Sequence, residues 1–136
     1  QYKDEVAPIK TFNNPLKNFY FKHIKKQNPY SLEAVEDLLS KFKKNVTLLR
    51  GNSNEILKNI ELEKVDFIFI DGGHEYNTVK NDLAHSHRLL KNKGIILCDD
   101  LNLSQALGVR QAIKEFSDEN KIDYEIVHER FAKFVF

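Results

Sequence analysis

The 136-residue sequence contains no methionine, one cysteine, three prolines and five glycines. A single cysteine, Cys98, cannot form a disulfide framework, so the chain is expected in a reducing compartment, by default the cytoplasm. No stretch has the length and apolarity of a signal peptide or a membrane span, so no membrane partner is expected. The lack of methionine and the start at Gln1 indicate a fragment, a processed form or a sequence with a part left out.

The charges of the sequence nearly cancel. The net charge is +1, which gives no sign of a nucleic-acid-binding surface. Lysines crowd the first third of the chain, and we expect them to form a solvated surface: Lys17, Lys22, Lys25, Lys26, Lys41, Lys43 and Lys44. The 41% apolar content is enough to fill one core. Without an internal repeat or a low-complexity linker, residues 1–136 are expected to form a single domain.

Apolar runs and helical patterns alternate from residue 45 onward. "VDFIFI" (65–70) is nearly continuous in apolar residues, which is typical of a strand covered on both faces in a parallel sheet. Strands are expected at 45–51, 65–70 and 94–100, helices at 54–60, 75–91 and 105–119, and a two-stranded hairpin at 123–136. Asn92-Lys93-Gly94 is expected to end the second of these helices. The alternation predicts an α/β fold with a mainly parallel sheet.

The first 45 residues carry weaker patterns. "SLEAVEDLLSKFKK" (31–44) predicts a helix with Ser31 as its N-cap, acidic residues near its start and lysines near its end. "NFYFKHI" (18–24) is compatible with a strand. Pro8 and Pro15 predict that residues 1–17 are mostly irregular.

Polar residues follow the expected ends of three strands. They are Asn52 and Ser53, then Asp71 to Glu75, then Asp99 and Asp100. Ligands of open parallel sheets bind beyond the carboxyl ends of the strands, where helices begin. Gly72 and Gly73 free the backbone to turn sharply and let a ligand approach closely, and the next helix offers unpaired N–H groups. The alternative is a tight strand-to-helix loop with no ligand.

Two segments carry a resemblance to a known family. "VDFIFIDGGHEYNTVKNDL…LLKNKGIILCDD", followed by "GVRQAIKEF", resembles the class I S-adenosylmethionine-dependent methyltransferases, and within them the small-molecule O-methyltransferases similar to macrocin O-methyltransferase. The resemblance covers about residues 45–136, and its most specific part is I-D-G-x-H-x-Y with a later G-I-I-x-x-D-D. It implies a Rossmann-like, mostly parallel sheet that ends in an antiparallel hairpin, with S-adenosylmethionine as cofactor.

The resemblance also assigns residues to the cofactor. "VTLLRGNSNEIL" is similar to the family's third strand and the loop that closes over the adenine, which places Asn52 and Ser53 there. Asp71, Gly72 and Gly73 are the other residues expected at the cofactor. Ser53 is either an adenine contact or the N-cap of the helix at 54–60, and both roles are compatible.

One part of the family pattern is missing from the sequence. The family's first strand ends in a loop of the E-x-G-x-x-x-G kind, whereas no glycine here precedes Gly51, and no acidic residue matches the one that holds the ribose. We expect that the chain lacks the first strand and this loop, or that it is a degenerate relative that does not bind the cofactor. Without that strand, residues 65–70 have an unpaired edge, which residues 6–24 or a partner chain, including a homo-oligomer, would cover.

The carboxylates Asp71, Asp99 and Asp100 are candidates for a metal site. They follow two strands that are neighbours in the family, and the resemblance implies such a triad in its metal-dependent members. Hard oxygen donors suit Mg²⁺, which lowers the pKa of a bound hydroxyl. Adjacent residues of a strand point to opposite faces, so Asp99 and Asp100 share an ion only if the strand has ended. The alternative is that these aspartates cap turns.

His74 is the candidate general base, and Asp71 is the carboxylate expected beside it in catalysis. A histidine is partly neutral near pH 7 and can accept a proton. The alternative is a histidine that only hydrogen-bonds its loop, and the other four histidines are expected to be packing or surface residues. Two functions follow: an O-methyltransferase acting on a hydroxyl of a small metabolite, or a non-catalytic remnant of the fold that serves in binding or assembly. The substrate itself is not encoded in any motif.

Overall fold

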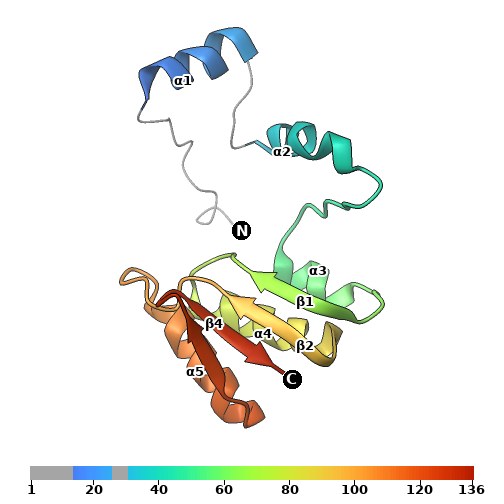
Figure 1. Ribbon diagram of the computed structural model, residues 1–136, viewed down its shortest axis with the longest axis vertical. Coiled ribbons are helices and arrows are strands. Elements are labelled where there is room, and N and C mark those ends of the chain that lie inside the picture. Colours follow the sequence, from blue (N-terminus) through green and yellow to red (C-terminus); the bar gives the residue numbers. More distant parts are fainter. Residues whose placement is uncertain (1–13, 26–30) are drawn as a thin grey trace. The chain divides into compact units, whose positions relative to one another are not determined.

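The computed structural model describes residues 14–25 and 31–136, which fall into two compact units that divide between Arg50 and Gly51 (Figure 1). In the first unit, helix α1 (Pro15–Phe19) continues into the π-helical turn η1 (Tyr20–Lys25), and α2 (Leu32–Leu39) continues into the 3-10 turn η2 (Ser40–Phe42). The strand considered for 18–24 is therefore wrong. The irregular structure expected before residue 14 and the substitute strand at 6–13 lie outside the described residues.

The cap of α2 is as the sequence predicts. Ser31 Oγ accepts a hydrogen bond from the Ala34 N–H at 3.3 Å. The strand expected at 45–51 is wrong, because residues 46–50 have no regular structure. Their apolar side chains are exposed, with Leu49 at 57%. Strand propensity reflects packing against neighbours more than an intrinsic backbone preference, and this segment pairs with no described strand.

The second unit is a four-stranded sheet with three helices. Its elements are α3 (Ser53–Asn59), β1 (Val65–Ile70), α4 (Tyr76–Leu89), β2 (Leu90–Cys98), α5 (Leu107–Asn120), β3 (Tyr124–Val127) and β4 (Phe131–Val135). The strand order is β1-β2-β4-β3, in which β1 and β2 are parallel and the other two pairings are antiparallel. The α/β class and the antiparallel C-terminal hairpin are confirmed.

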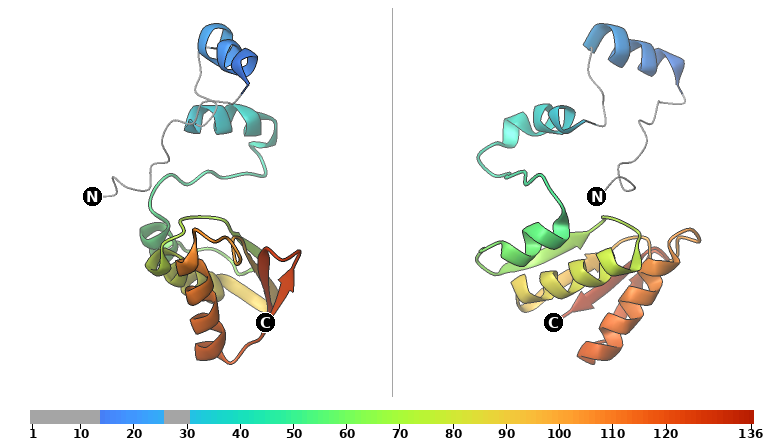
Figure 2. Two further views of the ribbon diagram at one scale, coloured as in Figure 1. Left: turned by 90° about the vertical axis from the view of Figure 1, so that its left-hand side faces the viewer. Right: turned by 180° about the vertical axis from the view of Figure 1, so that it is seen from behind.

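The helices of this unit lie on one face of the sheet (Figure 2). On that face Ile96 and Phe134 are fully buried, together with Leu83 and Ile113 from the helices. Phe67 and Phe69 are 55% and 47% exposed, so the expectation that β1 is covered on both faces is wrong. The strand lies at the edge of the sheet, and no described strand pairs with its outer side.

No helix within 14–25 and 31–136 is both long and apolar enough to cross a membrane.

Helix α4 ends earlier than the Asn92-Lys93-Gly94 sequence predicts. Leu89 is its last residue, and β2 begins at once with the buried Leu90. Gly94 serves a different purpose, because a Cβ there would lie 2.5 Å from Leu90 Cγ and 2.9 Å from the Lys91 carbonyl oxygen. The glycine therefore permits a close approach within the irregular start of the strand, where Lys93 has a φ of 65°.

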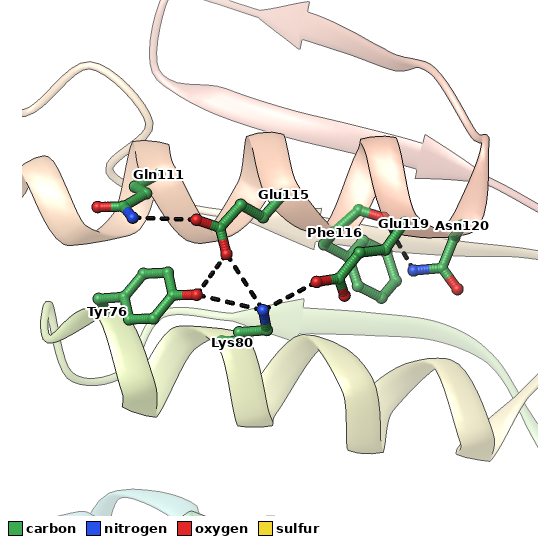
Figure 3. A network of polar contacts seen from close by, with 7 residues as sticks. All are labelled: Tyr76, Lys80, Gln111, Glu115, Phe116, Glu119 and Asn120. Atoms are coloured by element: carbon green, nitrogen blue, oxygen red, sulfur yellow. Dashed lines mark hydrogen bonds and ion pairs between the residues drawn. The ribbon is translucent and has the colours of Figure 1, made fainter.

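A polar network joins α4 to α5 (Figure 3). The Tyr76 hydroxyl donates to Glu115 Oε2, and Lys80 Nζ donates to the same oxygen at 3.1 Å and to Glu119 Oε1 at 2.9 Å. Hydrogen bonds from Tyr76, then from Gln111 and Lys80, lower the pKa of Glu115 to about 2. Phe116 is buried in the core, while Tyr76 is half-buried with its hydroxyl in this network.

Replacing Glu115 with glutamine should lower Tm at neutral pH by a small amount, since the network is partly exposed to solvent. A carboxyl whose pKa is lowered on folding stabilises the protein above its ordinary value of 4.5, and the stabilisation is lost as pH falls toward about 2. The Tm gap between wild type and Glu115→Gln should therefore narrow over that range. Asp118→Asn removes the same charge from an exposed position of α5 and is the control; a gap independent of pH would contradict this role.

Candidate functional site

The loops after β1 and β2 lie side by side at the carboxyl ends of these two parallel strands. Ile70 and Cys98, the last residues of the two strands, are paired, and the Asp99 N–H donates to the Ile70 carbonyl at 2.9 Å. β2 has ended before Asp99, and Asp100 has a φ of 61°. The two loops line one small hollow: Asp71, Gly72, Gly73, His74, Asp99 and Asp100. Its volume of about 10 Å³ is room for roughly one water molecule.

Asp99 is buried and is held by an arginine from the C-terminal hairpin. Arg130 Nε donates to Asp99 Oδ1 and Arg130 Nη2 to Asp99 Oδ2, both at 2.5 Å. The Asp100 N–H also donates to Asp99 Oδ1, at 2.6 Å. Burial alone would raise the pKa of Asp99, but the hydrogen bonds from Arg130 outweigh it and leave the pKa below its ordinary value. Asp99 is therefore an ionised, structurally fixed carboxylate.

The hairpin turn that carries Arg130 is tied to the segment after β2. His128 and Glu129 have φ values of 51° and 57°, and this left-handed pair turns the chain between β3 and β4. The Leu101 N–H donates to the Arg130 carbonyl at 2.9 Å, and Asn102 Nδ2 donates to the Glu129 carbonyl at 2.6 Å. Arg130 is not predicted from the sequence, because no motif connects this turn to residues about thirty positions earlier.

The imidazole of His74 lies against the carboxylate of Asp100. Its Nε2 lies 2.9 Å from Asp100 Oδ2, and half of the imidazole side chain is exposed (51%), against 18% for Asp100. Helix α5 fixes the backbone of this loop, because a Cβ on Gly108 would lie 3.0 Å from the His74 carbonyl oxygen and 2.7 Å from the Tyr76 nitrogen. Gly108 is likewise not predicted from the sequence, since its role depends on the packing of α5 against the loop.

The three aspartates as arranged do not fit a resident divalent ion. Both oxygens of Asp99 accept from Arg130, and one oxygen of Asp100 faces His74. Asp71 is exposed at the start of its loop. Within the described ranges, no group of three histidine, cysteine, aspartate or glutamate side chains is placed to hold a metal. An ion at this position would have to displace the guanidinium from a buried carboxylate.

The residues expected at the cofactor lie in two places. Asn52, and not Ser53, caps α3: its Oδ1 accepts from the Asn54 N–H at 2.8 Å, so the expectation of Ser53 as N-cap is wrong. Neither residue lines the hollow after β1 and β2. Gly72 and Gly73 line it, yet neither has a positive φ, so the turn does not require glycine for its backbone conformation. A Cβ on Gly72 would meet Asp82 Oδ2 at an ordinary 3.4 Å.

The chain is similar to known methyltransferases. A solved O-methyltransferase, NovP, matches with a TM-score of 0.64 and 11% identity over 96% of this chain and 54% of its own. CalS11, a TDP-rhamnose 3'-O-methyltransferase of calicheamicin biosynthesis, matches with a TM-score of 0.57 and 19% identity over 82% and 52%. The precorrin-6y C5,15-methyltransferase of Geobacter metallireducens GS-15 gives 0.58 and 23% over 80% and 63%.

These structural matches show the fold, and the chain spans between half and two thirds of the length of each. No curated protein sequence matches it. The family profile described as "Methyltransferase domain" matches residues 11–101, well over half of the chain. The pattern of two strand ends bearing Asp71 and His74, then Asp99 and Asp100, lies within that match. The chain therefore belongs to the methyltransferase domain family.

Proposed function

We propose that the protein is an S-adenosylmethionine-dependent O-methyltransferase that acts on a hydroxyl of a small metabolite. The observation that carries the proposal is the His74–Asp100 pair, at 2.9 Å, at the strand ends of a methyltransferase domain. The fold alone does not choose the acceptor atom, because one structural neighbour bears the name of a C5,15-methyltransferase. A histidine paired with a carboxylate is suited to removing a proton from a hydroxyl, which favours oxygen.

The geometry suggests how His74 would act. Nε2 lies 2.9 Å from Asp100 Oδ2, and we propose that it carries the hydrogen of the neutral imidazole. Nδ1 is then unprotonated and able to take the proton of a substrate hydroxyl. The imidazolium that results is stabilised by the same carboxylate. The cofactor, when bound, supplies a methyl group on a positively charged sulfur. Asp71, exposed at the start of the loop, would favour that positive charge electrostatically.

The glycines of the loop support the same proposal. Backbone conformation does not require Gly72 or Gly73, and the absence of side chains there would let a ligand approach the loop closely. Asn52 and Ser53 are assigned to the adenine end of the cofactor by family resemblance. We propose that residues 1–136 belong to one methyltransferase domain, since the family match runs through both units of the chain.

Several finer expectations stay predictions. Mg²⁺ assistance by Asp71, Asp99 and Asp100 is not among them, because the described residues hold no group of side chains placed to bind an ion. A cytoplasmic location, a homo-oligomer and the absence of nucleic-acid and membrane partners are proposed from the sequence.

A non-catalytic module is the second candidate function. The observations in its favour are the hollow of about 10 Å³, which is far smaller than a cofactor, and the exposed aromatic side chains on β1. Calorimetric titration with S-adenosylmethionine separates the two candidates. We expect weak or no binding to the 136-residue chain, which lacks the glycine-rich loop, and clear binding to a longer protein that contains it. If neither the 136-residue chain nor the longer protein bound S-adenosylmethionine, the non-catalytic module would be favoured.

Substituting Gly72 with alanine should weaken cofactor binding without unfolding the protein. The new Cβ meets no atom closer than 3.4 Å, so Tm should stay within about 2 °C of wild type, in line with a change of a few tenths of a kcal/mol. In a form of the protein that binds S-adenosylmethionine, the Kd should rise, because the new methyl group adds bulk to a loop that is proposed to lie close to the cofactor.

Gly94→Ala is the matched control for this substitution. Its Cβ would collide with Leu90 and Lys91, so it should lower Tm while leaving the cofactor loop unchanged. Equal Kd values for wild type and Gly72→Ala would show that this glycine serves the turn and not the cofactor.

A further inference from the structure

One guanidinium contacts two of the three carboxylates that the sequence pattern assigns to a metal ion. Arg130 donates to both oxygens of Asp99, and its Nη2 lies 3.9 Å from Asp100 Oδ1. Attraction to Asp71 is also among the interactions that stabilise its positive charge. The arginine therefore occupies the electrostatic position that a divalent ion would have.

Carboxylates gathered at neighbouring strand ends repel each other unless a cation or protons offset their charge. An arginine keeps its charge at every physiological pH, and its planar fork matches a carboxylate in a bidentate geometry. Asp99 has only 3% of its side chain exposed, so it depends most on a partner of this kind. We propose that the Arg130 guanidinium is the resident cation of this carboxylate cluster, which keeps its charge balance and shape without an added metal ion.

The arginine is held in place before any ligand arrives. Its own carbonyl accepts from the Leu101 N–H, and its guanidinium lies 5.2 Å from the centre of the Phe131 ring. Through Asp99 it also acts on the next residue, because Asp99 Oδ1 accepts from the Asp100 N–H, and Asp100 in turn holds His74. Arg130 is thus a positioning residue for His74. This last step rests on the proposed function, whereas the charge balance does not.

The test measures Tm of the full chain in EDTA, in millimolar MgCl2 and in NaCl of equal ionic strength, for wild type and Arg130→Gln. Wild type should melt at the same temperature in EDTA and MgCl2. Arg130→Gln should melt several degrees lower in EDTA and regain much of the loss in MgCl2 but not in NaCl, because Mg²⁺ then binds the uncompensated carboxylates. No methyl transfer is needed, so a failed function would leave this result intact.

A matched control is Arg110→Gln, which removes an arginine that donates to the Leu101 carbonyl and to Asn102 instead of to a carboxylate. It should show no gain in MgCl2. A higher Tm of wild type in MgCl2 than in EDTA would overturn the proposal. So would a lowered Tm of Arg130→Gln that MgCl2 does not raise. If Arg130→Gln does not fold, Arg130→Lys is the second variant, because it keeps the positive charge but loses the planar, bidentate guanidinium. Its Tm should be lower than that of wild type and should be the same in EDTA and MgCl2. A higher Tm of Arg130→Lys in MgCl2 would overturn the proposal.

Discussion

Gly108→Ala is expected to destabilise the protein by about 2 kcal/mol, within the range for overpacking at a well-packed contact. The Cβ would lie 2.7 Å from the Tyr76 nitrogen, 3.0 Å from the His74 carbonyl oxygen and 3.1 Å from the Tyr76 Cα, all of them backbone atoms. A backbone segment cannot rotate aside as a side chain can. Helix α5 must therefore move away from the loop that carries His74, or the loop must move away from Asp100.

Whether Gly108→Ala lowers or raises the free energy of unfolding tells steric overlap apart from helix propensity. Gly108 is the second residue of α5, where alanine on helix propensity alone would stabilise by up to about 1 kcal/mol. Denaturant unfolding of wild type and Gly108→Ala gives the difference in free energy of unfolding. Leu107→Ala is the control from the same turn, because Leu107 is 71% exposed and its loss should cost little. A stabilised Gly108→Ala would show that the contact between α5 and the His74 loop is not tight.

The elements that sequence predicts well are those whose residues pack in the core. β1 begins and ends where the apolar run "VDFIFI" does, and α5 follows the stripe of Val109, Ala112, Ile113 and Phe116, all of which are buried. The segments 18–24 and 46–50 are not predicted, because their apolar residues are read as strands although no described strand pairs with them. In the first, the ring centres of Phe19 and His23 lie 4.9 Å apart, a contact between residues four positions apart that is typical of a helix and not of a strand.

The candidate site divides in the same way. Asp71, His74, Asp99 and Asp100 are predicted from sequence because each follows a recognisable apolar strand, and parallel pairing brings those ends together. Arg130 is not, because its contact with Asp99 spans 31 positions and depends on two left-handed residues in a hairpin turn. Because Arg130 is not predicted from the sequence, a metal ion is left as the simplest counter-charge for the clustered aspartates.

His74→Ala in a protein that turns over is expected to lower kcat for methyl transfer by about 10²–10⁴-fold, the usual contribution of a general base. The Kd for S-adenosylmethionine should not change, because the proposed role concerns the substrate proton. Asp100→Asn should lower kcat by about 10²-fold or more, since the amide no longer stabilises the imidazolium or fixes Nε2 as the protonated nitrogen. Formation of S-adenosylhomocysteine with the accepted hydroxyl compound provides the rate.

The double variant tests whether the two residues act as one unit. If Asp100 works only through the 2.9 Å contact with His74, then removing it from a protein that already lacks the imidazole should cost little more, so the effects should be strongly non-additive. His85→Ala, on the following helix, is the control and should leave kcat near wild type. Fully additive losses would mean that Asp100 meets the substrate or cofactor directly, and an unchanged kcat in His74→Ala would leave this imidazole as a loop contact alone.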